Sequence, residues 1–342
     1  MNNRTVIAAD IAKNVFQCVQ FKNHHQIGKN KAYKRSEFIK LITHSSPSVF
    51  VMETCSGAQH WGRLAKKYQH EVILIAPRIV AGYRQGQKTD ANDALAIYEA
   101  SRAQHLKASP QKTLQQQNLA TLESVRSHYQ RQKTKLNNAL RGLLSEFGIV
   151  MPKGYARLRA QLPLILEDAE NGLPDESRFA IDVYWQDWQQ SHLKVLQIEK
   201  QKRKVLGEIA NGKSLLKIEG IGPVCASQLI CALGDASVFK RGKDAAAFIG
   251  TAPKQHSSGG KEISIGISKK TGHKQLRSAL IQGAWSVIIR LKAKENPSSE
   301  KELWLLQLIE RVGENRAAVA LANKNVRTAW ALLAHQREYV AA

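Results

Sequence analysis

Apolar residues near the start of the chain fall in short uninterrupted runs, and two of these runs end at a carboxylate. Residues 6–9 lead into Asp10, and residues 49–52 lead into Glu53. Runs of this length are typical of buried strands. If the two strands are parallel neighbours, Asp10 and Glu53 emerge side by side at one edge of a sheet.

Further patterns complete a mixed α/β layer between the first residue and about residue 106. The sequence predicts two more strands at 15–21 and 71–76, and helices at 37–43 and 57–68. The strand at 15–21 is expected to pair back against the first strand, with His24 to Gln26 as turn residues. This return, and the lack of a Gly-rich phosphate loop after any predicted strand, argue against a doubly wound nucleotide fold. An RNase H-like fold is the better match.

Asp90 and Asp93 stand at the head of a helical pattern that runs to about His105, so they share one helix face in its first turn. Aspartates at this position often only cap the free backbone N–H groups. Here, however, they add to Asp10 and Glu53. Four converging acids repel one another unless cations neutralise them, and carboxylate oxygens are ligands that Mg²⁺ prefers. We therefore favour a magnesium site over four independent caps.

From about 111 to 212 the composition shifts to Gln, Lys, Arg and Leu with helical spacing. Two apolar stripes predict an antiparallel helical arm with a looped tip near 151–157. The first stripe consists of Leu119, Leu122, Val125, Tyr129, Leu136, Leu140, Leu143 and Phe147, and the returning one of Trp185, Trp188, Val195, Ile198, Val205 and Ile209. The charged positions between them, such as Lys200, Lys202, Arg203 and Lys204, are expected to be solvated or to face phosphate.

The last third opens with a Gly-x-Gly turn, Gly220 to Gly222, between two helical patterns. Such turns occur in helix-hairpin-helix elements, where backbone N–H groups contact a DNA phosphate, and also in plain helix-helix turns. Residues 257–260 read Ser-Ser-Gly-Gly and predict a flexible loop between basic residues. A basic helix start follows at 269–277, which suits phosphate contact. Two closing helices are predicted at 302–312 and 325–334.

The charge of the chain indicates the kind of partner that the protein binds. The 51 Lys and Arg residues exceed the 28 acids, which gives a formal charge of +23. A polyanionic partner, DNA or RNA, is expected because this excess would otherwise repel itself. No apolar run approaches the ~20 residues of a membrane span, and no signal peptide is recognised, so we expect an intracellular protein. The spacing of Cys18, Cys55, Cys225 and Cys231 favours buried, reduced thiols over zinc ligands or disulfides.

Taken in order, these motifs resemble the DEDD transposases of bacterial insertion sequences, of the IS110 and IS1111 type. The resemblance covers nearly the whole chain. It rests on Asp10, Glu53–Gly57, Lys88–Ala94, Ile218–Pro223, Phe248–Gly250, Ser257–Lys261 and Thr271–His273.

The resemblance implies a RuvC-like (RNase H-like) metal-binding domain at 1–108, an antiparallel coiled-coil arm at 109–212, and a mainly α transposase domain at 213–342 with the hairpin element. It implies that Asp10, Glu53, Asp90 and Asp93 bind Mg²⁺ and that Ser258 is a nucleophile forming a covalent protein-DNA intermediate, with the adjacent Ser257 as the alternative. The expected nucleic-acid-binding residues are Lys88, Gly220, Gly222, Lys254, Lys261, Lys269, Lys270, His273, Lys274 and Arg277.

The same resemblance implies donor and target DNA as substrates, a noncoding bridge RNA as guide, and a homo-oligomer, either a dimer or a tetramer on DNA. It implies a bacterial cytoplasmic protein that joins the nucleoid when bound to DNA. Two other hypotheses stay open on the sequence alone. One is a RuvC-like Mg²⁺-dependent endonuclease or junction resolvase that forms no covalent intermediate, and the other is a non-enzymatic nucleic-acid-binding scaffold.

Overall fold

The computed structural model describes residues 4–106, 108–258, 261–267 and 273–339. The chain divides into two compact units. The first holds residues 1–114, 232–273 and 326–335, and the second holds residues 115–231, 274–325 and 336–342. The three-domain division predicted from the sequence stays a prediction.

The first unit contains a five-stranded sheet in the order β3-β2-β1-β4-β5. Its strands are β1 (Val6–Ile11), β2 (Val15–Lys22), β3 (His25–Lys34), β4 (Val49–Glu53) and β5 (Glu71–Ile75). Strands β1, β2 and β3 pair antiparallel, whereas β1, β4 and β5 pair parallel. The predicted return of β2 against β1 is confirmed. The sequence missed β3, because this edge strand is exposed at most positions and has no apolar alternation.

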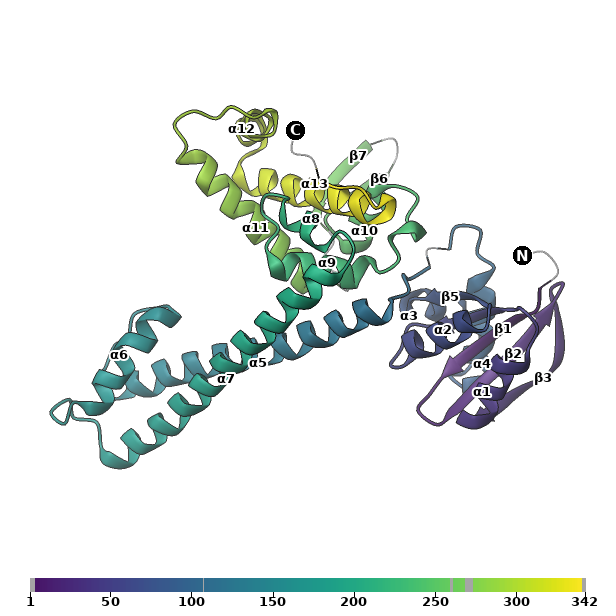
Figure 1. Ribbon diagram of the computed structural model, residues 1–342, viewed down its shortest axis with the longest axis horizontal. Helices are drawn as coiled ribbons and strands as arrows, with labels where there is room; N and C mark the ends of the chain where they lie inside the picture. The colour runs from purple at the N-terminus through teal and green to yellow at the C-terminus, as the bar shows by residue number, and fades with distance from the viewer. Residues whose placement is uncertain (1–3, 107, 259–260, 268–272, 340–342) are drawn as a thin grey trace. The chain divides into compact units, whose positions relative to one another are not determined.

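Helices cover both faces of this sheet, as Figure 1 shows in purple and blue. Alternate residues of β1 belong to two separate hydrophobic clusters, since successive strand side chains point to opposite faces. One face packs against α1 (Arg35–His44) and α2 (Ala58–Lys67). The other packs against α4 (Asp90–Ser101) and the short α3 (Pro77–Val80), which is followed by the 3-10 turn η1 (Ala81–Tyr83).

Two long helices dominate the second unit and run side by side in Figure 1. They are α5 (Leu114–Glu146) and α7 (Asp175–Glu208), with α6 (Tyr155–Glu167) near the turn between them. Residues of all three helices share one hydrophobic cluster that includes Leu140, Leu158 and Trp188. The predicted looped tip is therefore partly helical. The description of α5 and α7 as a coiled-coil arm stays a prediction.

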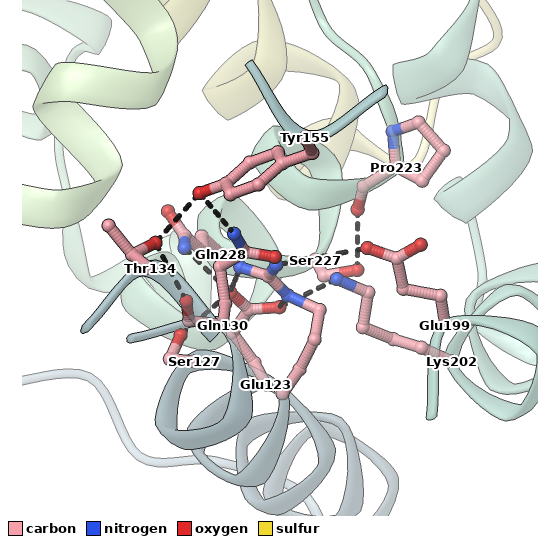
Figure 2. A network of polar contacts seen from close by, with 11 residues as sticks. Glu123, Ser127, Gln130, Thr134, Tyr155, Glu199, Lys202, Pro223, Ser227 and Gln228 are labelled. Atoms are coloured by element: carbon pink, nitrogen blue, oxygen red, sulfur yellow. Dashed lines mark hydrogen bonds and ion pairs between the residues drawn. The ribbon is translucent and has the colours of Figure 1, made fainter. Parts of the chain in front are cut away.

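The prediction that Lys202 is solvated or faces phosphate on the outside of this helix pair is wrong. Its side chain is 1% exposed, and its Nζ donates to Glu123 Oε2 at 2.6 Å. Figure 2 shows the polar network around Glu123, which also accepts hydrogen bonds from Arg126 and Gln228. Conversely, three apolar residues expected in the seam are exposed, namely Val125, Leu143 and Phe147. A polar cluster thus replaces part of the apolar seam, because paired charges can be buried where single ones cannot.

Further helices, short and long, and a β-hairpin complete the two units. They are α8 (Gly212–Leu216), α9 (Pro223–Leu233), η2 (Ala236–Val238), α10 (Gly242–Ile249), β6 (Pro253–Ser258), β7 (Lys261–Ile267), α11 (Lys274–Lys292), α12 (Glu300–Val312) and α13 (Glu314–His335). The predicted C-terminal helices are confirmed, although α13 begins earlier than expected. None of the helices within the described ranges combines the length and apolarity that a membrane span requires. The four cysteines are free thiols, and Cys55 is exposed rather than buried.

Candidate active site

Strand register places two predicted acids side by side. Ala9 of β1 is paired with Met52 of β4 in the parallel ladder, so Asp10 and Glu53 follow at the same sheet edge. Side chains along a strand alternate between the two faces of the sheet. Asp10 is therefore on the same face as Ala8, and Glu53 on the same face as Val51, and both of these residues pack against α4. The expected parallel arrangement is confirmed, and it directs both carboxylates to the α4 side of the sheet.

Helix α4 brings the other two acids to that side. Asp90 and Asp93 lie in its first turn, followed at helical spacing by Ala94 and Ile97, which are buried against the sheet. The helix is capped by Thr89, whose Oγ1 accepts a hydrogen bond from the Asn92 backbone N–H at 3.2 Å. The capping hypothesis therefore loses its main support, because a threonine does this work and the two aspartates need another role.

A polar contact from the sheet fixes the start of α4. Asn30 on β3 donates its Nδ2 hydrogen to the Ala91 carbonyl at 2.9 Å, and its Oδ1 accepts from Gln17 Nε2 at 2.6 Å. The edge strand that the sequence missed thus positions the first turn of α4, which carries both aspartates.

The acids act on one another electrostatically. Burial raises the pKa of Asp10, and the negative charges of Asp93 and Asp90 raise it further. Burial likewise raises the pKa of Glu53, with added repulsion from Asp10 and Asp93. Positive charge on Arg84 and Lys88 opposes these shifts only in part. Such mutual repulsion shows that the cluster carries more negative charge than its surroundings neutralise.

This donor set fits a hard divalent cation such as Mg²⁺, because it consists of carboxylate oxygens alone and Arg84 and Lys88 offset its negative charge only in part. Asp10, Glu53, Asp90 and Asp93 are the residues that would hold it. Among the described residues, no three His, Cys, Asp or Glu side chains already stand close enough to form a preformed cage. Small side-chain movements at the sheet edge would have to complete it.

Two neighbours of the cluster were missed by sequence reasoning. Arg84 forms an ion pair with Asp93. Cys55 donates from Sγ to the Ile11 carbonyl at 3.5 Å. Although the residue as a whole is exposed, partial burial of its thiol raises the pKa, and the charges of Glu53 and Asp10 raise it further. Neither has a sequence signal. Arg84 follows the short helical stretch 77–83, which has no periodicity long enough to predict.

The predicted serine loop is in fact part of a hairpin. Strands β6 and β7 pair antiparallel, with Ser257 opposite Glu262 and Ser258 opposite Lys261. Ser257 is exposed. Ser258 ends β6, and its side chain lies outside the described part of the structure, as do the linking residues Gly259 and Gly260. Strand pairing from Gln255 to Ser258 replaces the flexible loop that the Ser-Gly composition predicted at Ser257 and Ser258.

The predicted phosphate-contacting residues differ in exposure. Lys88, Lys254 and Lys274 are exposed, whereas Arg277 is buried. The ring of His273 packs against that of Phe248 in a tilted arrangement, with ring centroids 4.8 Å apart. Burial, followed by the charges of Lys112 and Arg78, lowers the pKa of His273. Lys269, Lys270 and the side chain of Lys261 lie outside the described residues.

Gly220 and Gly222 occupy different environments in the turn between α8 and α9. Gly220 has φ of +82°, and a Cβ there would lie 2.9 Å from the Gly283 carbonyl oxygen of α11. The positive φ and the close contact both require glycine at this position, so local packing explains Gly220 without any phosphate contact. Gly222 has no atom within 4 Å of an added Cβ, so a side chain would fit there and packing does not require glycine.

Comparison with known proteins agrees with this architecture. A family model for DEDD transposases matches residues 7–149, and a model described as "Transposase IS116/IS110/IS902 family" matches residues 212–298. The transposase for insertion sequence element IS1111A of Coxiella burnetii is 35% identical over 99% of this chain and 92% of its own length. A probable family 20 transposase of Pseudomonas aeruginosa is 35% identical over 98% of this chain and 99% of its own. The pilin gene-inverting protein of Moraxella bovis is 26% identical over 82% of each chain.

A mixed α/β domain with clustered acids, joined to helical segments that match transposase models, defines a DNA-processing enzyme of the transposase class. More specifically, the chain belongs to the IS110 family of insertion-sequence transposases.

Proposed function

We propose that this transposase cuts and rejoins DNA strands at a Mg²⁺ site formed by Asp10, Glu53, Asp90 and Asp93. The observation that carries the proposal is the convergence of these acids on one side of the sheet, with Thr89 rather than an aspartate as the helix cap. The strand order and the mixture of parallel and antiparallel pairs support an RNase H-like, RuvC-like assignment for this domain. A divalent cation bound there would neutralise charge at the reacting phosphate and stabilise the departing oxygen.

The nucleophile in this proposal is Ser258. Its hydroxyl oxygen attacks the phosphorus of a DNA phosphodiester, and the new oxygen–phosphorus bond replaces the bond to one deoxyribose oxygen. That leaving oxygen takes the electron pair and, in the net reaction, the proton that the serine loses. Attack by the freed oxygen of another strand on the phosphoserine ester reverses these steps, so rejoining needs no ATP. The gene-inverting relatives support rejoining, because by their name they invert a DNA segment.

The partners follow from charge and family. The formal charge of +23 suits large nucleic acids, and we propose donor and target DNA, a guiding bridge RNA, and assembly as a homo-oligomer. Relatives named as transposases of insertion sequences support DNA as the substrate.

Substitution of the acids tests the metal site. Asp90→Ala should abolish Mg²⁺-dependent strand cleavage, with a loss of at least about a hundredfold, because one of the cation's ligands is removed. Cleavage of labelled donor DNA is measured in the presence of the flanking noncoding transcript. Glu99→Ala is the matched control, since Glu99 is an exposed acid on the same helix and forms an exposed ion pair with Arg102. Cleavage by Asp90→Ala at the rate of Glu99→Ala would refute the metal site and favour the scaffold hypothesis.

A further inference from the structure

One cation lies directly against the carboxylate cluster. The Arg84 guanidinium forms an ion pair through Nε with Asp93 Oδ1. The side chains are only 27% and 13% exposed, respectively. By contrast, the Arg102–Glu99 pair at the other end of α4 is 43% and 48% exposed. Water screens the Arg84 pair less than a surface pair, so its attraction is stronger.

The charge of Arg84 reaches more than one acid. It also favours the ionised form of Glu53, which lies on β4. Lys88 acts on Asp10 and Glu53 from a greater exposure and makes no ion pair among the residues that the structure describes. Arg84 thus lies where a divalent ion would compete with it for Asp93, and where a DNA phosphate would compete with Asp93 for the guanidinium.

We propose that Arg84 is a positioning residue with two alternative partners: it pairs with Asp93 while the site is metal-free, and it pairs with the DNA phosphodiester once a divalent cation occupies Asp93. The proposal rests on the proposed function of the acid cluster. A guanidinium suits both partners, because its planar array of N–H donors matches carboxylate and phosphate oxygens equally well.

This exchange has a thermodynamic consequence. The metal must displace Arg84 from Asp93 and must approach against its positive charge, so Arg84 weakens metal binding in the absence of DNA. When DNA is present, the released guanidinium gains a phosphate partner and the cost is recovered. Metal and DNA therefore strengthen each other's binding through Arg84, by the same factor in both directions.

The test measures metal affinity without turnover. Mn²⁺, a hard cation that carboxylates also bind, is titrated into the full-length, DNA-free protein and followed by electron paramagnetic resonance. Arg84→Gln should tighten Mn²⁺ binding roughly threefold to tenfold, because a tenfold change corresponds to about 1.4 kcal/mol, near the upper end for one partly buried pair. Arg102→Gln, which removes the same charge from an exposed pair on the same helix, should change it less than about twofold.

DNA supplies the second half of the test. With Mn²⁺ bound, Arg84→Gln should hold donor DNA more weakly than the Arg102→Gln control. In the same variant, adding DNA should no longer tighten Mn²⁺ binding. A residue that only supports the fold would weaken both affinities together and would not raise the affinity for metal. Arg84→Lys keeps the charge without the planar array, so its Mn²⁺ affinity should fall between those of the wild type and Arg84→Gln.

Two outcomes distinguish a failure of the proposed role of Arg84 from a failure of the proposed metal site. If Asp90→Ala binds Mn²⁺ as tightly as the wild type, the acid cluster is not the metal site and the proposed function fails. If Asp90→Ala loses Mn²⁺ while Arg84→Gln binds it no tighter than the wild type, only the role of Arg84 is wrong. Should Arg84→Gln fail to fold, weaker Mn²⁺ binding by Arg84→Lys than by the wild type would equally overturn the proposal.

Discussion

At the scale of single residues, the buried charges around Glu123 show how this protein holds α5, α7 and α9 together. Glu123 accepts hydrogen bonds from Arg126, Lys202 and Gln228, at distances from 2.6 to 3.1 Å (Figure 2). Burial alone would raise the pKa of Glu123, but the bonds from Arg126 and Lys202 outweigh it and lower the pKa. Since Glu123 neutralises both Arg126 and Lys202, losing its carboxylate should destabilise the fold more than losing either cation.

Glu123→Ala should therefore be among the most destabilising single substitutions in the second unit. It leaves Lys202 and Arg126 without their main anion, and breaking a buried pair in this way costs about 3–5 kcal/mol. Glu199→Ala is the control, because Glu199 lies 3.8 Å from Arg126, is 30% exposed, and should cost less than about 1 kcal/mol. Chemical denaturation followed by tryptophan fluorescence, to which Trp185 and Trp188 on α7 contribute, measures both. Equal losses for the two variants would contradict the ranking.

The lowered pKa of Glu123 also sets a pH dependence. Because the folded value lies below the ordinary carboxyl value of 4.5, the stabilisation by Glu123 is complete above pH 4.5 and is lost as the pH falls through the folded value. The stability difference between the wild type and Glu123→Gln should thus shrink in acid. It should stay constant from pH 6 to pH 8, and a difference that grew in acid would reverse the assigned sign.

At the scale of elements, the turn between α8 and α9 shows that two glycines of one motif have different reasons to be there. Gly220 combines a positive φ with close contact to the Gly283 backbone, whereas Gly222 meets nothing. Packing explains the first glycine. The open space at Gly222 leaves both a plain helix-helix turn and the proposed approach of a phosphate as explanations for the second.

Alanine at each position separates these roles. Gly220→Ala should lower the free energy of unfolding by about 1–3 kcal/mol, because alanine is strained at φ > 0 and its Cβ meets a backbone oxygen. Gly222→Ala should change stability by less than about 0.5 kcal/mol and should weaken DNA binding. Thermal melts and filter binding measure the two effects. A destabilised Gly222→Ala, or a Gly220→Ala protein as stable as the wild type, would show that the assignment is reversed.

The elements that could be predicted from the sequence are those with a clear apolar pattern. Strands β1 and β4, with their terminal acids, and the start of α4 at Asp90 were found because buried strands and acids at the head of a helical pattern leave strong local signals. Strand β3 and the β6–β7 hairpin were missed, since they are polar and their pairing depends on partners distant from the local pattern. The predicted exposure of Lys202 was wrong for a related reason, because nothing near Lys202 in the sequence shows that Glu123 is its partner.

At the scale of the whole molecule, a strongly basic protein carries an acidic site. The formal charge of +23 attracts nucleic acid to the protein as a whole, while Asp10, Glu53, Asp90 and Asp93 repel a phosphate locally. The divalent cation proposed for these acids would reconcile the two facts, because it would neutralise the local negative charge where DNA approaches. Charge and the order of motifs made the family recognisable from the sequence. The contacts of Arg84 with the site needed the three-dimensional structure.

The most direct test of this account is whether the protein becomes covalently joined to DNA through Ser258. Labelled donor DNA is incubated with protein, transcript and Mg²⁺, and the adduct is trapped under denaturing conditions. The account predicts an adduct with the wild type and with Ser257→Ala, the matched neighbour on β6, and none with Ser258→Ala or Asp90→Ala. An adduct that persists in Ser258→Ala and disappears in Ser257→Ala would place the nucleophile one residue earlier. Strand cleavage by the wild type without any adduct would contradict the covalent mechanism and leave the metal-dependent endonuclease in its place.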